Sequence, residues 1–210
     1  PTGRRSASTT TRPVTPRRLA AAAASHPSFI GFGSIYPGMD GYEEVLDELQ
    51  ALGSRGLKIH PDFQKLPIDD PSGIETYRSI ARRGLPVLMH MGDNRYDFSS
   101  PERLTNLIRR VPDLVVIAAH FGGYTRWEEA SHILAGMPNL YTDCSSSFFA
   151  LDDRTAVEII RRYGADRVLF GTDYPMWRAE DEIGHLLSLG LTEDECSAIF
   201  AGNVKRLLEI

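Results

Sequence analysis

Short apolar runs alternate with amphipathic stretches from Phe29 to the end of the chain. Each run ends at glycine, proline or serine, which is typical of a buried strand in a parallel sheet. The stretches between the runs have the 3.6-residue apolar period of helices that pack one face against a sheet, as in 41–52. The runs cover residues 29–37, 57–61, 86–92, 114–123, 140–146 and 168–175.

Successive runs begin 26 to 29 residues apart, which is the length of one strand-loop-helix-loop unit. Six such units allow either a closed eightfold barrel or an open doubly wound sheet. A barrel would need two more units, about 56 residues at this spacing, whereas only 28 residues, without a strand pattern, precede Phe29. We therefore expect an α/β fold of the (β/α)8 TIM-barrel type, with six βα units present and the two N-terminal units missing.

Residues 1–25 differ in composition from the rest of the chain. They contain five arginines and no acidic residue, and they are rich in Ser, Thr and Pro without apolar periodicity. Such a composition does not form packed structure by itself. We expect an irregular segment over 1–25 and a single, partial barrel domain over 26–210.

Composition and charge exclude several classes of protein. Of the 210 residues, 42% are hydrophobic and 24% are charged, as in an ordinary globular domain. The apolar stretches are too short to cross a bilayer, and the net charge of −5 argues against a nucleic-acid partner. Two cysteines, Cys144 and Cys196, cannot form a disulfide framework, which favours the reducing cytoplasm.

Three apolar runs end in a residue that can bind a metal: His90, His120 and Asp173. A single histidine at a strand end is more often a hydrogen-bonded core residue, but three such positions on three strands indicate a site. They would converge at the carboxyl ends of the strands, where barrel enzymes build their active sites. Imidazole and carboxylate ligands suit Zn²⁺, with Mn²⁺ or Fe²⁺ as alternatives, and a bound ion would activate water for hydrolysis or assist proton transfer.

Several segments together resemble the amidohydrolase superfamily, in the branch that contains aminocarboxymuconate semialdehyde decarboxylase. They are IGFGSIYP, GLKIHPDFQ, PVLMHMGDNRYDFSSPERL, VVIAAHFGG, VLFGTDYPMW and IFAGNVKRLLEI. The resemblance implies a barrel enzyme in which His90 and Asp173 bind a divalent metal. It implies that His120 is a catalytic acid/base, or a ligand where two metals are held. The family's first-strand His-x-His pair has no counterpart in this chain.

Lys58 and His60 lie two residues apart on a predicted strand, so they face the same side. Both are candidate substrate contacts. The resemblance allows a carboxylated Lys58 that bridges two metals, and a lysine that binds a substrate carboxylate is the alternative. For His60 the simpler interpretation is a hydrogen bond to loop backbone.

Arg95 and Trp177 complete the set of candidate substrate-binding residues. Arg95 follows His90 and could bind an anionic substrate through a bidentate pair, or it could pair with Asp93 or Asp97. Trp177 could form an aromatic wall of the pocket or simply pack. Asp143 is a candidate for orienting a ligand histidine.

We therefore predict a metal-dependent hydrolase that acts on a small carboxylated or cyclic compound through metal-activated water, with Asp173 or His120 moving the proton. A nonoxidative metal-dependent decarboxylase would use the same residues. A third hypothesis is a noncatalytic barrel fragment, which the missing His-x-His pair favours. An open barrel exposes strand edges, so self-association into homo-oligomers is a further expectation.

Overall fold

A computed structural model describes residue 26 and residues 28–210, so the predicted irregular segment 1–25 lies outside the described residues. Within the described part, five parallel strands form one sheet in which the spatial order follows the chain order. A sheet without reversal of strand order is the arrangement of a barrel rather than of a doubly wound fold. The strands are β1 (Leu57–Ile59), β2 (Val87–Met89), β3 (Val116–Ala118), β4 (Leu140–Asp143) and β5 (Val168–Leu169).

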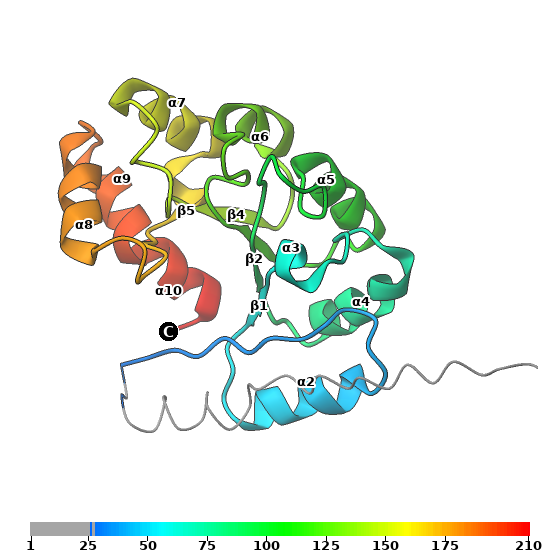
Figure 1. Ribbon diagram of the computed structural model, residues 1–210. Coiled ribbons are helices and arrows are strands. Elements are labelled where there is room, and N and C mark those ends of the chain that lie inside the picture. The colour runs from blue at the N-terminus through cyan, green and yellow to red at the C-terminus, as the bar shows by residue number, and fades with distance from the viewer. Residues whose placement is uncertain (1–25, 27) are drawn as a thin grey trace, which may run out of the picture.

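Strands and helices alternate along the chain, and most of the helices lie in an arc on the outer side of the sheet (Figure 1). Neighbouring helices pack side by side, α2 against α4, α5 against α6 and α6 against α7. The bounds are α2 (Tyr42–Ala51), α3 (Pro61–Gln64), α4 (Ile74–Arg82), α5 (Pro101–Arg110), α6 (Trp127–Leu134), α7 (Asp153–Tyr163), α8 (Ala179–Ser188), α9 (Glu193–Ser197) and α10 (Asn203–Leu208). Short 3₁₀ turns cover Pro71–Gly73 and Ala165–Arg167, and a π turn covers Ala198–Gly202.

The first predicted strand, 29–37, is reduced to a single parallel bridge between Gly33 and Leu57. The N–H of Gly33 donates to the carbonyl of Gly56 at 3.0 Å, and the N–H of Lys58 donates to the carbonyl of Gly33 at 2.6 Å. Phe29, near the start of this run, is 61% exposed. The run is therefore less buried than its apolar residues predict. Its single bridge to β1 is too short to form a regular strand.

The hydrophobic core lies between the sheet and the helices. Leu57, Val87 and Val116 occupy equivalent positions in β1, β2 and β3 and are fully buried. The apolar stripes of the helices cover them, for example through Leu104 and Leu107 of α5. Each such side chain contributes about 1.5–3 kcal/mol when it is removed from water. This packing holds the strands in the register that brings their carboxyl ends to one edge.

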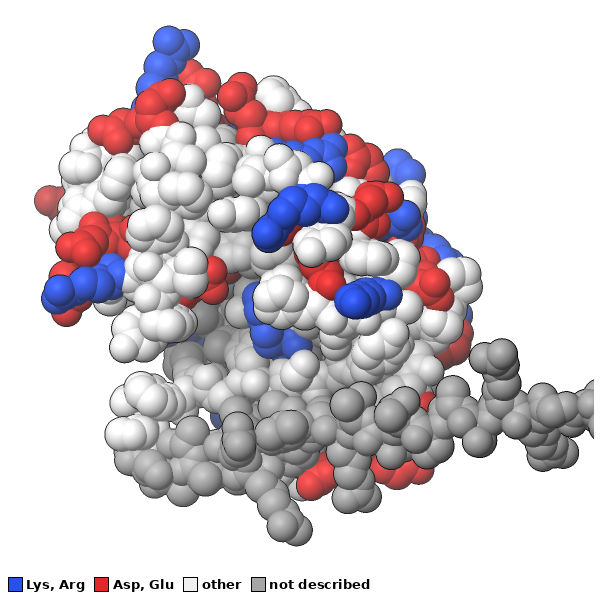
Figure 2. All heavy atoms as spheres, viewed as in Figure 1, with Lys and Arg blue, Asp and Glu red and all other residues white. Residues whose placement is uncertain are grey.

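Charged side chains of both signs are interspersed over the face seen in Figure 2. Some ion pairs join residues one helical turn apart, such as Glu75 with Arg78 and Arg126 with Glu129. In the described part of the chain, no helix has the length and apolar content needed to cross a membrane.

Candidate active site

Three histidines follow consecutive strands and lie side by side at the carboxyl edge of the sheet. His60 and His90 come directly after β1 and β2, and His120 comes two residues after β3. The rings of His60 and His90 stack with centroids 3.9 Å apart, and the ring of His120 meets that of His90 edge-on at 5.0 Å. The structure therefore brings His90 and His120 together and adds His60, which the sequence suggested only as a substrate contact.

His60, Asp62 and His90 form the group that could hold a metal ion among the described residues, with one ligand atom from each within 4.8 Å of the others. Three buried atoms of this group, Nδ1 of His60, Oδ1 of Asp62 and Nε2 of His90, have no hydrogen-bond partner in the described part. Buried polar atoms without partners are costly and call for an explanation such as an ion. Two imidazoles and one carboxylate are ligands that suit Zn²⁺, Mn²⁺ or Fe²⁺, so the residues present fit a divalent metal.

Asp62 is the member of this group that sequence reasoning missed. It lies in the first turn of α3, which begins with proline directly after His60. Its Oδ2 lies 3.5 Å from Nε2 of His90 and 2.9 Å from the hydroxyl of Ser99. A carboxylate two residues after a strand-end histidine, in the segment KIHPDF, was the available signal.

Burial keeps both stacked imidazoles neutral. It lowers the pKa of His60 to about 4 and that of His90 to about 2, and the neighbouring cationic groups add to both shifts. Burial also raises the pKa of Asp62. Neutral imidazoles have the free lone pair that a metal requires, so the histidines are ready ligands at pH 7.

Asp173 lies outside the group formed by His60, Asp62 and His90. Its Oδ2 accepts a hydrogen bond of 2.9 Å from Ser146, and the residue is exposed.

Burial lowers the pKa of Lys58, while the negative charges of Asp143 and Asp173 oppose that shift. Lys58 is therefore a partly buried amine with two carboxylates in its surroundings.

His120 is 3% exposed and is held by residues at the end of β4 and just after it. Its backbone N–H donates to Oδ1 of Asp143 at 3.1 Å, and its Nδ1 lies 2.9 Å from Oγ of Ser145. Its φ of 59° lies in the left-handed region, which is uncommon for residues other than glycine and frequent at functional sites. Asp143 thus contacts His120 directly at the backbone and reaches its ring through Ser145.

Arg95 binds Asp93 in the described structure, the alternative that the sequence left open. Its Nε lies 2.8 Å from Oδ1 of Asp93, and its side chain is 70% exposed. Trp177 donates from Nε1 to Oγ of Ser146 at 3.0 Å and stacks on Phe149 with centroids 4.9 Å apart. Trp177 is therefore linked to Asp173 through Ser146, and the stacked rings form an aromatic wall.

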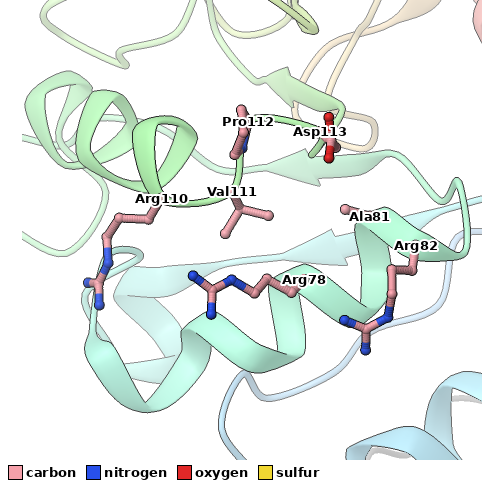
Figure 3. Close-up of a pocket in the computed structure, with 7 residues that line it drawn as sticks. All are labelled: Arg78, Ala81, Arg82, Arg110, Val111, Pro112 and Asp113. Carbon is pink, nitrogen blue, oxygen red and sulfur yellow. The ribbon is translucent and has the colours of Figure 1, made fainter.

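A surface cavity of about 310 Å³ lies elsewhere, between α4 and the segment after α5 (Figure 3). Its lining residues precede β2 and β3 in the chain, so the cavity lies toward the amino ends of these strands, away from the histidines. They are Arg78, Ala81, Arg82, Arg110, Val111, Pro112 and Asp113. None belongs to the predicted site.

A family model described as Amidohydrolase matches residues 3–210. The chain therefore belongs to the amidohydrolase family, and both the resemblance and the partial (β/α) barrel are confirmed. Among solved structures, an uncharacterized TIM-barrel protein from Bordetella bronchiseptica is 27% identical with a TM-score of 0.79. That alignment covers 93% of this chain and 72% of that chain.

Two other solved structures share the fold at lower identity. A dihydroxybenzoic acid decarboxylase from Polaromonas, with bound manganese and the inhibitor 2-nitroresorcinol, is 18% identical with a TM-score of 0.74. That alignment covers 92% of this chain and 73% of that chain. A protein described as a putative 2-pyrone-4,6-dicarboxylic acid hydrolase, from Pseudomonas putida, is 19% identical with a TM-score of 0.69. That alignment covers 92% of this chain and 77% of that chain.

Proposed function

We propose that this protein is a metal-dependent hydrolase of the amidohydrolase family that acts on small carboxylated or cyclic compounds. The observation that carries the proposal is the convergence of His60, Asp62 and His90 at the carboxyl edge of the sheet, where each of the three also has a buried side-chain atom without a hydrogen-bond partner in the described part of the chain. When bound there, a divalent metal would supply Lewis-acid polarisation of a substrate oxygen and a lowered pKa for water.

The other residues of the site have roles that follow from their surroundings. Asp173, exposed and bonded to Ser146, is the proposed acid/base that accepts and returns a proton. Lys58, whose pKa is lowered by burial, is the proposed partner of a substrate carboxylate. The stacked rings of Phe149 and Trp177 offer a flat apolar surface to a cyclic substrate. Arg95 is engaged with Asp93, so its release would be needed before it could bind an anion.

The metal is Zn²⁺ in our proposal, with Mn²⁺ as the alternative that the manganese-bound relative supports. The test is direct measurement of Zn²⁺ and Mn²⁺ binding by calorimetry and of metal content by mass spectrometry. The variants H60A, D62N and H90A should each weaken binding. H132A, which removes an exposed histidine on α6, is the matched control and should bind as the wild type does. Equal binding by all variants would refute this ligand set.

Nonoxidative decarboxylation is the second candidate reaction. The decarboxylase relative and the aromatic wall beside Asp173 support it, because an aromatic acid would place its ring on Phe149 and Trp177. Assays with carboxylated lactones and with hydroxybenzoates separate the reactions. Incorporation of ¹⁸O from water indicates hydrolysis, and release of CO₂ without ¹⁸O in the remaining product indicates decarboxylation. Metal binding without turnover on either panel would support the noncatalytic hypothesis.

A further inference from the structure

Both ring nitrogens of His120 have defined neighbours. Nδ1 lies 3.0 Å from the carbonyl oxygen of Ser145 and 2.9 Å from its hydroxyl, while Nε2 lies 3.2 Å from Nδ1 of His90. A carbonyl oxygen can only accept a hydrogen bond, so Nδ1 of His120 must carry the hydrogen. In the neutral ring, Nε2 of His120 is then the acceptor.

The hydroxyl of Ser145 is compatible with this assignment because its own hydrogen is directed elsewhere. Its Oγ lies 2.5 Å from Oδ1 of Asp143, which also accepts the backbone N–H groups of His120 at 3.1 Å and Ser145 at 3.0 Å. The carboxylate oxygen therefore receives the hydroxyl hydrogen, and a lone pair of Ser145 Oγ is left for Nδ1–H of His120. Three donors therefore hold this carboxylate oxygen, and the hydrogen of the Ser145 hydroxyl points toward Asp143 rather than toward His120.

The same logic extends to His90. Since Nε2 of His120 is an acceptor, Nδ1 of His90 must be the donor across the 3.2 Å contact. Nε2 of His90 is then without a hydrogen, and it is the buried atom without a partner that lies 3.5 Å from Oδ2 of Asp62. The hydrogen-bond chain thus ends in a free lone pair at the candidate metal group.

We propose that His120 is a positioning residue that holds His90 in its Nδ1–H tautomer with Nε2 directed at the metal, and that Ser145 and Asp143 hold His120 in turn. The inference rests on the proposed function, because it assigns the lone pair to a metal. Outer partners of this kind typically change metal affinity by about 10–100-fold.

The tautomers are measurable without metal or substrate. Long-range ¹H–¹⁵N NMR correlations of the metal-free wild-type protein should show Nδ1–H in both His90 and His120. Nε2–H in His90 would overturn the proposal, whatever the metal affinity. Absence of Zn²⁺ binding by the wild type would refute the proposed function but leave this tautomer measurement intact, so the two failures are distinguishable.

Two substitutions at His120 test the role in metal binding. H120L fills the space without an acceptor, so His90 loses its partner and Zn²⁺ affinity, measured by competition with a chromophoric chelator, should fall about 10–100-fold. H120Q supplies an amide oxygen for Nδ1–H of His90 and should recover most of that affinity. Equal large losses in both variants would identify His120 as a ligand and overturn the proposal. Unchanged affinity in both would also overturn it.

His120 is buried, so each variant is first compared with the wild type by circular dichroism and thermal unfolding. If H120L does not fold, the second measurement is the tautomer of His90 in H120Q and the tautomer of His120 in D143N. The proposal predicts that H120Q keeps the Nδ1–H signal of His90 and that D143N weakens the fixed tautomer of His120. Loss of the His90 signal in H120Q would contradict it.

Discussion

The hydroxyl of Ser146 donates a hydrogen bond of 2.9 Å to the carboxylate of Asp173. The same hydroxyl oxygen accepts the indole N–H of Trp177 at 3.0 Å, so one buried serine connects the exposed carboxylate to the aromatic wall. Ser146 itself has a φ of 48°, in the left-handed region that functional sites often contain. The direction of the Asp173 carboxylate thus depends on a residue from the loop after β4.

Replacement of Ser146 tests this connection. S146A should reduce turnover more than substrate binding, because Asp173 loses its orienting donor, and should cost about 1 kcal/mol in unfolding free energy for the lost hydrogen bond. In a W127F background, the fluorescence of Trp177 should shift because its N–H loses the acceptor. The control S188A removes a hydroxyl whose hydrogen bond in the described structure goes to the carbonyl of His185 in the same helix. An unchanged Trp177 emission in S146A would contradict the connection.

Metal removal gives the second prediction. Zn²⁺ at 100 times its dissociation constant should stabilise the wild type by about 2.7 kcal/mol, because the ion binds the folded chain. Dialysis against a chelator should reverse the gain, as followed by thermal unfolding. D62N should lose most of this gain, whereas D113N, which changes an exposed aspartate, should retain it. A full gain in D62N would exclude Asp62 as a ligand.

Glu182 provides a pH-dependent prediction away from the metal group. Its side chain is buried in α8, Oε2 has no partner in the described part of the chain, and burial raises its pKa. An acid with a raised pKa in the folded state favours folding when it is protonated. Its contribution is therefore present below the unfolded pKa and is lost as pH rises through the folded pKa. E182Q should be more stable than the wild type at pH 7, and the difference should shrink toward pH 4.

Urea unfolding at both pH values measures this difference. E180Q is the matched control, since Glu180 is exposed in the same first turn of α8. Losing an acid near a helix N-terminus costs about 0.3–1 kcal/mol, so E180Q should be slightly less stable at pH 7. If E182Q were also less stable at pH 7, helix-end electrostatics would outweigh burial.

Gly92 gives a prediction about the backbone that supports His90. A Cβ there would lie 2.6 Å from the carbonyl oxygen of Tyr124 and 2.6 Å from the carbonyl carbon of Gly123, and φ is 80°. G92A should therefore destabilise the protein by more than the about 1–2 kcal/mol of a left-handed residue alone. G84A isolates that smaller cost, because φ is 65° and a Cβ would meet no described atom within 4 Å. Similar losses in unfolding free energy for both variants would argue against the close approach.

Periodicity and strand endings were sufficient to predict the parallel α/β architecture and to place His90 and His120 at one edge of the sheet. The spacing of apolar residues differs between strands and helices, so it reveals the order of the elements. In a barrel of parallel strands, the carboxyl ends of all strands lie on the same side. The run 29–37 shows the limit of that reasoning. Its apolar residues satisfy the pattern, but regular strand pairing depends on neighbours, and in the described structure only Gly33 bridges to β1.

Tertiary structure alone decided which side chains meet and which atoms remain free. The contacts of His90 with His120, of Asp62 with Ser99 and of His120 with Ser145 join residues 25 to 37 positions apart. A hydrophobic pattern predicts whether a residue is buried, but it does not predict its hydrogen-bond partners. Those partners depend on distances and angles between side chains from separate loops. For that reason the sequence indicated a metal site near His90, whereas the folded structure brought Asp62, in the first turn of α3, to within 3.5 Å of His90.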